Sequence, residues 1–246
     1  MVQCPLILIF CCVMSLSTMA QTAREIIASS IEKTGGSKWT SINGFRIVAN
    51  LDQGGVMFPL EIVQLKDGRQ YSRINFQGME IKQGVFDGDI LWSTNFQTQK
   101  PEQADSETTD NFRLDRNDFP DDLINYPKKG YTVELVGKAV MMEKSCYKIR
   151  LEKEPSTRPG KLTDDVVYYY FDADSYLPVA KEFEMKHGPI QGSIMVLQFD
   201  DFRPVKGLLF PFSMTQGVKD APAQPIKVES ITLNPVVDMS EFKFPK

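Results

Sequence analysis

Residues 201–213 read DFRPVKGLLFPFS, a polar corner that runs directly into an apolar segment. Pro204 fixes the backbone of the corner, and Gly207 allows dihedral angles that other residues avoid. Residues 200–207 are therefore predicted to form a turn between two antiparallel strands. Ser213 is the only hydroxyl group of the stretch and has no base beside it, so the stretch indicates a fold and not a reaction.

The apolar part of the stretch is predicted to begin a strand. Leu208, Phe210 and Phe212 then share one face and Leu209 takes the other, because side chains alternate along a strand. Pro211 has no N–H group to donate, which places this strand near a sheet edge or a bend. An apolar row of this size needs a cover, which helices, the protein's own core or a ligand would provide.

The same alternation recurs along most of the chain. Turn dipeptides such as Asp67-Gly68 separate the apolar runs, and both residues tolerate the positive φ of a tight hairpin. Because no helix-length crossover separates the runs, the strands are predicted to be antiparallel and to number about eleven or twelve. They are expected at residues 43–52, 56–66, 69–77, 79–87, 89–96, 131–139, 145–153, 166–172, 178–186, 190–200, 207–216 and 225–234.

Two parts of the chain have a different character. Residues 21–34 carry apolar side chains at the helical period, and the glycine pair that follows is a typical helix stop. Residues 97–130 are predicted to be an insertion, in which a solvated loop precedes one or two short helices. No second domain boundary is visible, so residues 21–246 are expected to form a single domain.

The first twenty residues carry no Asp, Glu, Lys or Arg and contain an apolar run. This composition is typical of a secretory signal peptide, with cleavage predicted after Ala20. The alternative is a transmembrane anchor, but the run is shorter than the roughly 20 apolar residues that a bilayer requires. The mature chain is therefore expected in the periplasm, as a monomer without a transmembrane segment.

Composition argues against several classes of function. The net charge of −4 and the pI of about 5.2 argue against binding to nucleic acid or to an anionic membrane surface. His187 is the only histidine, so a zinc site with two or three imidazoles is impossible, and neither a metal nor another cofactor is expected. Cys146, the only cysteine beyond the predicted signal, is interpreted as a small buried apolar residue.

Two pairs of carboxylates are spaced like the start of a calcium loop. Asp87 and Asp89 form one pair, and Asp172 and Asp174 form the other. The remaining calcium ligands are missing in both pairs and both lie where a hairpin turns, so a turn is the preferred interpretation. Carboxylates from distant strands could also form a glycosidase-like site, and the 32 acidic residues of the chain leave its place open.

Several strands are apolar on both faces. Residues 166–171, 194–199 and 208–212 show this most clearly. One face of such a strand packs on a core and the other needs a cover, for which an ordinary core and a bound ligand are both open explanations. The methionines of the mature chain suit an adaptable apolar pocket, although methionine also fills ordinary cores.

The order of several motifs resembles that of a known family. An N-terminal helix that ends in Gly-Gly precedes four motifs and a final FKFP at residues 242–245. The four motifs are FDGDILW (86–92), VELVG (133–137), YFDADSYLP (170–178) and DDFRPVKGLLFP (200–211). This order resembles the exported outer-membrane lipoprotein-sorting proteins of the LolA/LolB superfamily, over essentially the whole mature chain.

The resemblance implies a mainly β fold of the α+β type. About eleven antiparallel strands would curve into a half-barrel, and helices would act as a lid over its concave, hydrophobic side. Carriers of this superfamily hold the acyl chains of lipoproteins in that cavity, while other members act as sensors. Arg113 and Arg116 are the candidates for the arginine that locks the lid in the carriers.

Three functions follow as hypotheses. The first is a non-catalytic periplasmic binder or carrier of acyl chains or other hydrophobic ligands, such as those met in lipoprotein sorting. The second is a structural or sensing module that docks a protein of the cell envelope, with the concave face filled by its own core. The third, ranked last, is an extracytoplasmic hydrolase that uses carboxylates. The residues predicted to line the groove of the first hypothesis are Phe45, Ile47, Trp92, Phe112, Phe119, Leu123, Tyr169, Met195, Leu197 and Phe210.

Overall fold

The computed structural model describes residues 21–76, 78–188 and 190–245. The predicted signal segment and its cleavage after Ala20 lie outside the described residues. Among the helices of the described ranges, none has the length and the apolar character needed to cross a bilayer.

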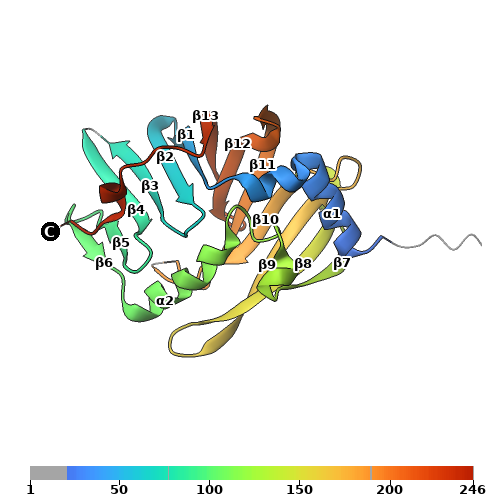
Figure 1. The fold of residues 1–246 in the computed structure, drawn as a ribbon, viewed down its shortest axis with the longest axis horizontal. Helices are drawn as coiled ribbons and strands as arrows, with labels where there is room; N and C mark the ends of the chain where they lie inside the picture. The colour runs from blue at the N-terminus through green and yellow to red at the C-terminus, as the bar shows by residue number, and fades with distance from the viewer. Residues whose placement is uncertain (1–20, 77, 189, 246) are drawn as a thin grey trace, which may run out of the picture.

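A single open antiparallel sheet forms the body of the fold, and it does not close into a barrel (Figure 1). Within the described residues it has thirteen strands, against the prediction of about eleven or twelve. The strand that the sequence did not reveal is β6, three residues within the predicted insertion, which is too short and polar to show a pattern. The strands are β1 (Gly44–Gln53), β2 (Val56–Leu65), β3 (Gln70–Phe76), β4 (Met79–Phe86), β5 (Leu91–Thr94), β6 (Pro101–Gln103), β7 (Thr132–Met141), β8 (Lys144–Thr157), β9 (Leu162–Asp172), β10 (Pro178–Glu184), β11 (Ile194–Val205), β12 (Leu208–Val218) and β13 (Gln224–Leu233).

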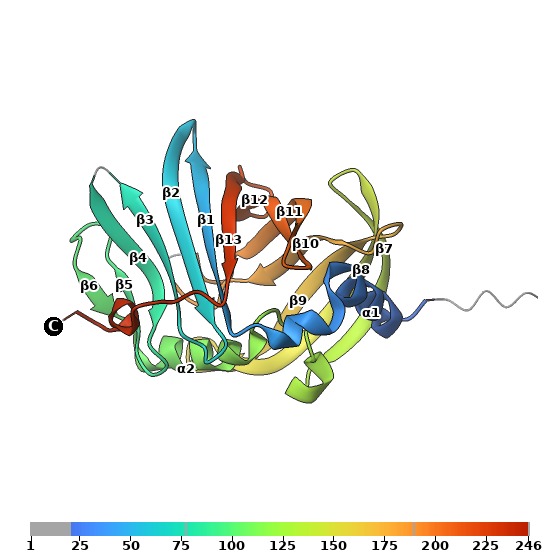
Figure 2. The same ribbon diagram turned by 45° about the horizontal axis from the view of Figure 1, so that its top comes forward.

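The strands follow two meanders that meet in the middle of the sheet. The order is β6-β5-β4-β3-β2-β1-β13-β12-β11-β10-β9-β8-β7, so the first strand pairs with the last. Phe45 lies opposite Leu233 in this pairing, which makes the sheet continuous. The sheet twists and bends strongly, and Figure 2 shows its two halves at a steep angle around a concave side.

The register defines which side chains face this concave side. Phe45 lies opposite Gln64 of β2, so these two side chains share one face. On the other half of the sheet, Tyr169, Lys181 and Leu197 lie side by side in β9, β10 and β11. Phe45 and these three residues border one common cavity, and their face of the sheet is called the concave face below.

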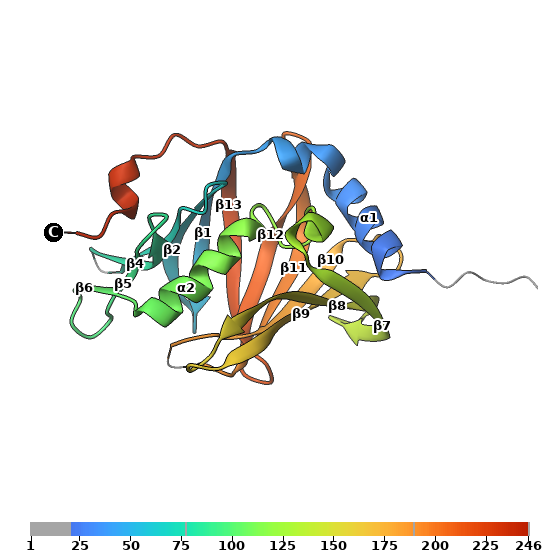
Figure 3. The same ribbon diagram turned by 60° about the horizontal axis from the view of Figure 1, so that its bottom comes forward.

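Two α-helices lie on the concave face. α1 (Ala23–Thr34) begins with a capping box, in which the side chains of Thr22 and Glu25 each accept a hydrogen bond from the other's backbone amide. α2 (Ser106–Asp115) begins at Asp105, whose carboxylate accepts a hydrogen bond from a backbone amide of the first turn. Figure 3 shows both helices in front of the sheet, α2 toward β4 and β5 and α1 toward β7 and β8. The short 3-10 helices are η1 (Gly36–Ser41), η2 (Arg116–Asp118), η3 (Tyr126–Lys129) and η4 (Met239–Phe242).

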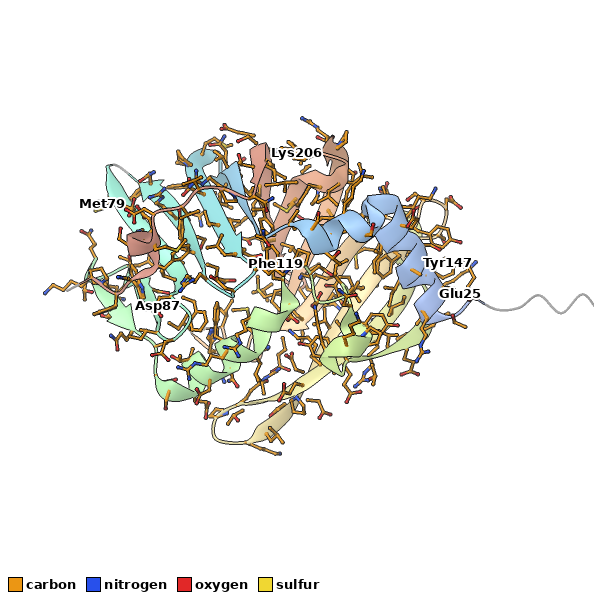
Figure 4. All side chains as sticks on the ribbon, viewed as in Figure 1. Glu25, Met79, Asp87, Phe119, Tyr147 and Lys206 are labelled. Carbon is orange, nitrogen blue, oxygen red and sulfur yellow. The ribbon has the colours of Figure 1, made fainter. Side chains whose placement is uncertain are left out.

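Residues 116–131, called the lid segment below, cross the concave face between α2 and β7. Leu123 and Tyr126 of this segment pack with Ile26 and Ile27 of α1 in one buried cluster. Figure 4 shows Phe119 of the lid segment near the centre of the molecule. The insertion contains helices as predicted, but α2 begins at Ser106, within residues 97–110 that the sequence predicted to be a solvated loop. The last part of the insertion is the element that covers the sheet.

The predicted turn at residues 200–207 is too long. β11 continues to Val205, and only Lys206 and Gly207 form the turn, because Val205 lies opposite Leu208. Both turn residues have positive φ, 50° and 84°, as a tight two-residue hairpin requires. The end of β11 is largely exposed, so its sequence lacks the apolar alternation by which a strand is recognised.

β12 is an interior strand, so of the two alternatives predicted there, a sheet edge or a bend, the sheet edge is wrong. It pairs with β11 along its length, but with β13 only over Ser213–Gln216. Pro211 lies in the half without a β13 partner, so its missing N–H group interrupts no pairing with β13. Leu208 and Phe210 are buried and Phe212 packs beside them, as the shared face predicts.

The protein itself covers the row that begins with Leu208. Gly35 lies so close that a Cβ there would be 2.4 Å from Leu208 Cδ2, and its φ of 140° also favours glycine. Trp39 of η1 meets Phe210 edge to face, with ring centroids 5.0 Å apart. The glycine that ends α1 therefore also lets the chain dock on β12.

The C-terminal segment covers the opposite, convex face near β3 to β5. Phe242 of η4 is fully buried against Val63, Tyr71 and Trp92. Val63 neighbours Gln64 in β2, so this cluster lies on the other side of the sheet from the concave face. The indole Nε1 of Trp92 donates a hydrogen bond to the Phe242 carbonyl oxygen at 2.9 Å.

Candidate binding cavities

The concave face changes from apolar to charged along its strands. α1 covers the apolar end, while the C-terminal end of α2 lies over the charged end. This gradient follows from which residues occupy the inward positions of each strand. In β8 and β9 the inward pairs are Tyr147 with Phe171, Ile149 with Tyr169, Leu151 with Val167 and Lys153 with Asp165.

An apolar cavity of about 240 Å³ lies beneath α1 and the lid segment. Ile27 and Ile31 of α1 form one wall, and Leu123 and Ile124 of the lid segment form another. Its volume exceeds the ~150 Å³ of an engineered cavity that binds benzene, but not the ~300–1,000 Å³ typical of pockets for larger ligands. In this conformation the cavity has room for one short apolar chain.

Many of the residues predicted to line a groove border this cavity. They come from both halves of the sheet and from the lid segment, although they are far apart in sequence. The alternation of inward and outward positions brings them to one face. They are Phe45, Ile47, Leu123, Tyr169, Leu197 and Phe210.

A second cavity, of about 330 Å³, adjoins the first and has a more polar lining. Phe112 and Phe119, both predicted for the apolar groove, line this cavity instead. Phe119 stacks on Phe45 with ring centroids 5.6 Å apart, so this ring pair stands between the two cavities. The residues that line both cavities, and so mark where they adjoin, are Pro120, Asp121 and Lys181.

Trp92 and Met195 line neither cavity. Trp92 lies opposite Val85 on the convex face, where the C-terminal segment buries it. Met195 shares the concave face with Leu197 but lies further along β11, opposite Phe183. A sequence pattern shows which residues of one strand share a face, but not which face the lid covers.

Paired charges border the second cavity. Lys153 of β8 is buried, and its Nζ lies 2.8 Å from Asp115 Oδ1 and also forms an ion pair with Asp118. Lys186 Nζ lies 2.9 Å from the same Asp115 oxygen and 2.6 Å from Asp165 Oδ2. These contacts tie the C-terminal end of α2 to β8, to β9 and to the segment after β10.

Arg158 extends this network. Its Nη2 lies 3.3 Å from Asp165 Oδ1, and its Nη1 lies 2.9 Å from Glu184 Oε1. Burial alone would lower the pKa of Lys153, but the carboxylates of Asp115 and its neighbours raise it well above the usual range. Lys153 therefore stays cationic, and each buried charge of the network has a partner, as burial of ions requires.

Asp121 and Asp122 of the lid segment place two adjacent carboxyl groups in the walls of the cavities, Asp121 in both and Asp122 in the second. The Tyr169 hydroxyl donates a hydrogen bond to Asp122, and Asp121 Oδ1 accepts one from the Leu123 amide at 2.9 Å. Burial and the charge of Asp122 raise the pKa of Asp121 to about 7. Burial would also raise the pKa of Asp122, but the ammonium groups of Lys181 and Lys153 and the hydrogen bond from Tyr169 together outweigh burial and lower that pKa. Asp121 therefore titrates near neutral pH while Asp122 stays ionised.

His187 and Cys146 do not form a catalytic pair. His187 borders the second cavity, and burial lowers the pKa of its imidazole. Cys146 is fully buried in a cluster on the convex face, where burial and the charge of Asp172 raise the pKa of its thiol. A thiol with a raised pKa is a weak nucleophile, and the two residues occupy opposite faces of the sheet.

The spaced carboxylates are turn formers, as the preferred interpretation predicted. Asp87 Oδ1 accepts a hydrogen bond from the Asp89 amide at 2.9 Å, and Asp172 Oδ1 accepts one from the Asp174 amide at 3.1 Å. Across the ranges that the structure describes, no group of three or more His, Cys, Asp or Glu side chains is arranged to hold a metal ion.

Sequence reasoning missed the charged network. The strand sequences did contain a sign of this network, because Lys153, Asp165 and Lys181 are charged residues at inward positions of their strands. A charge at such a position needs a partner from another element. Asp115 and Asp118 supply the partners of Lys153, but their distance in sequence hid the match.

No protein-family model matches the chain, and no curated protein matches its sequence. Solved structures do match the chain, and the three described here match over most of the length of both chains. A LolA superfamily protein of Nitrosomonas europaea is 13% identical, with a TM-score of 0.52, and the match covers 91% of this chain and 98% of that chain. The chain has the fold of the LolA superfamily. A DUF1329 family protein of Desulfovibrio piger is 14% identical (TM-score 0.54; 91% and 98% covered), and an outer-membrane lipoprotein-sorting protein domain of Vibrio parahaemolyticus is 12% identical (TM-score 0.50; 89% and 94% covered).

One of the two candidate arginines, Arg113, fastens α2 to the sheet. Arg113 Nη2 donates hydrogen bonds to the backbone oxygen of Asp89 at 2.7 Å and to its Oδ1 at 2.6 Å. This contact joins α2 to the turn between β4 and β5. Arg116 instead packs over Gly68, where an added Cβ would lie 2.7 Å from Arg116 Cβ.

Proposed function

We propose that the chain binds an acyl chain, or another apolar molecule of similar width, in the cavity beneath the lid segment, and that it does so without catalysis. The apolar cavity of about 240 Å³ is the observation that carries this proposal. Each methylene group that enters such a cavity contributes about 0.8 kcal/mol, so an eight-carbon chain gains several kcal/mol before ordering costs.

The proposed setting is the periplasm, where the chain would act as a single-domain, monomeric carrier. The signal-like composition of residues 1–20 supports the compartment, and the likeness to a lipoprotein-sorting domain supports lipoprotein acyl chains as the cargo. A cargo with several acyl chains is larger than the cavity, so its binding requires the lid segment to move. Ion pairs and hydrogen bonds hold this segment, and both can re-form after it opens.

Saturable binding of a fluorescent fatty acid to the purified protein tests the proposal. Leu197 lines the cavity from β11, so Leu197→Trp should fill it and weaken binding by about tenfold or more. Met195→Trp is the matched control, since Met195 lies on the same strand and face but outside the cavity. If wild-type protein shows no saturable binding, or if both variants weaken it equally, the proposal fails.

A second candidate function, docking of a protein partner, is favoured by the open edge of the sheet. In the described part of the chain β7 has no neighbour on its outer side, and Val136 and Val140 are 52% and 76% exposed. An extended peptide can pair with such an edge. This function leaves the cavity unused, so Leu197→Trp would not alter partner binding, whereas Val140→Pro would.

A further inference from the structure

Lys181 places a single cation in the wall of the apolar cavity. It lies in β10 between Tyr169 of β9 and Leu197 of β11, which also line that cavity. Its Nζ is 5.8 Å from the ring centroid of Tyr169 and 5.9 Å from that of Phe183. Because Lys181 also lines the second cavity, it lies at the junction of the apolar cavity and its more polar neighbour.

The other basic side chains of the buried network have carboxylate partners. Lys153, Lys186 and Arg158 are paired as described above, and Lys129 Nζ lies 3.9 Å from Asp118 Oδ1. Among the described residues, Lys181 forms no ion pair, and its polar head is left to two aromatic faces. Burial alone would lower the pKa of Lys181, but the charges of Asp122 and Asp121 raise it, so the side chain stays cationic.

A half-buried cation that has no carboxylate within ion-pair distance favours a ligand that supplies one. Ion-paired hydrogen bonds are about twice as strong as neutral ones, and water exclusion strengthens them further. An anionic group at the junction also leaves the attached apolar chain free to enter the 240 Å³ cavity. The position of Lys181 at the polar boundary of that cavity thus fits an amphiphile with its charge at one end.

The surrounding acids decide between an anionic and a cationic head group. Asp122 already accepts a hydrogen bond from the Tyr169 hydroxyl. Among the residues that line both cavities, Asp121 is the one with a carboxyl group. The pKa of Asp121, raised to about 7, makes it neutral in mildly acidic solution, where it can donate a hydrogen bond to a carboxylate. A cationic head group would instead be repelled by the Lys181 ammonium. The charged and titratable groups that face Asp121 from the neighbouring elements are Asp118, Asp122, Lys129, Lys153, Tyr169 and Lys181.

We propose that Lys181 binds the anionic head group of the cargo, so that the preferred ligand is a fatty carboxylate whose chain lies in the apolar cavity. This inference rests on the proposed function and adds the chemical class of the head group. Asp121 serves as the second contact to the carboxylate, from the lid segment, so the bound head group joins the lid to the floor of the sheet.

Three ligands of equal chain length test the proposal: octanoic acid, octan-1-ol and octylamine, titrated into the whole protein by calorimetry at pH 6. Octanoic acid should bind about tenfold or more tightly than octan-1-ol, and octylamine more weakly than either. If octan-1-ol binds as tightly as octanoic acid, or if octylamine binds tightest, the assignment of Lys181 is overturned. If none of the three binds, the proposed function itself fails, which distinguishes the two failures.

Variants of Lys181 test whether this residue causes the preference for octanoic acid. Lys181→Met should reduce the ratio of the octanoic acid and octan-1-ol affinities to about one, while Lys181→Arg should retain a preference for the acid. Lys148→Met is the matched control, because Lys148 also lies over tyrosine rings, at 4.3 Å from the Tyr168 centroid, but next to the inward Ile149 and therefore on the convex face. An unchanged ratio in Lys181→Met, with a folded protein by circular dichroism, would refute the proposal.

Discussion

Lys153 Nζ lies 2.8 Å from Asp115 Oδ1, and this contact fastens the end of α2 to the floor of the sheet. The same ammonium also pairs with Asp118 of the lid segment. One buried lysine therefore holds two successive parts of the cover in place. The lid of this LolA-like fold is fixed at its charged end by electrostatics and at its apolar end by packing against α1.

Replacing Lys153 by methionine should lower the free energy of unfolding by about 3–5 kcal/mol, because buried carboxylates lose their main cation. Urea denaturation measures this loss. The exposed Lys161 provides the control, and Lys161→Met should change stability by less than about 0.5 kcal/mol. Adding Asp118→Asn to Lys153→Met should restore part of the stability, and a double variant no more stable than the single one would contradict this account.

Asp121 should make stability depend on pH. Burial and Asp122 raise its pKa from 3.8 to about 7, so between these values the native state keeps a proton that the unfolded chain has lost. Stability therefore falls as pH rises through this window, by at most about 4 kcal/mol. Asp121→Asn should remove this fall, as measured by denaturant titrations at pH 5 and pH 8.

The comparison of wild type with Asp121→Asn isolates this group. Burial lowers the pKa of His187, so its own contribution rises with pH, but it is present in both proteins and cancels. Parallel pH profiles of the two proteins would show that Asp121 does not carry a raised pKa.

Gly35→Ala should destabilise the protein by more than about 2 kcal/mol, since it combines a strained φ with a clash against Leu208. Gly54→Ala is the matched control: Gly54 also has positive φ, 64°, but nothing lies within 4 Å of a Cβ there. The control should lose only the strain, about 1 kcal/mol. Thermal unfolding measures both, and equal losses would show that the close approach of Gly35 to Leu208 has no energetic weight.

Phe119→Ala should lower stability by about 2 kcal/mol, through loss of packing and of the stacked contact with Phe45. Phe96→Ala is the comparison, because Phe96 is 64% exposed and its truncation should change little. Chemical denaturation distinguishes the two. An equally small effect of both changes would mean that the ring pair between the cavities does not hold the lid segment.

Much of the sheet was predictable from local sequence. The turn before β4 and the hairpins after Asp67 and Asp87 follow from residues that tolerate positive φ. Alternation also placed Leu208, Phe210 and Phe212 on one side of their strand, as found in the structure. The exposed end of β11 was mistaken for a turn because it lacks that alternation.

The candidate site was predictable only in part. Trp92 has the alternation of a buried strand residue, and the sequence could not show that its cover is the C-terminal segment rather than the lid. The sequence did not reveal the site at Lys181, because the charge state of this lysine depends on carboxylates, Asp121 and Asp122, that only the fold brings near it. Periodicity assigns a residue to a face, whereas a partner comes from another element of the fold.

Local sequence predicted every strand of the described residues except β6, together with the first helix and its glycine stop, because these depend on neighbours a few residues away. The tertiary fold was needed to show that β1 joins β13, that one face receives the lid and the other the C-terminal segment, and that the concave side holds two unlike cavities. These features arise from contacts between residues far apart in the chain, and the energy of a buried charge such as that of Lys153 exists only once its partners are brought beside it.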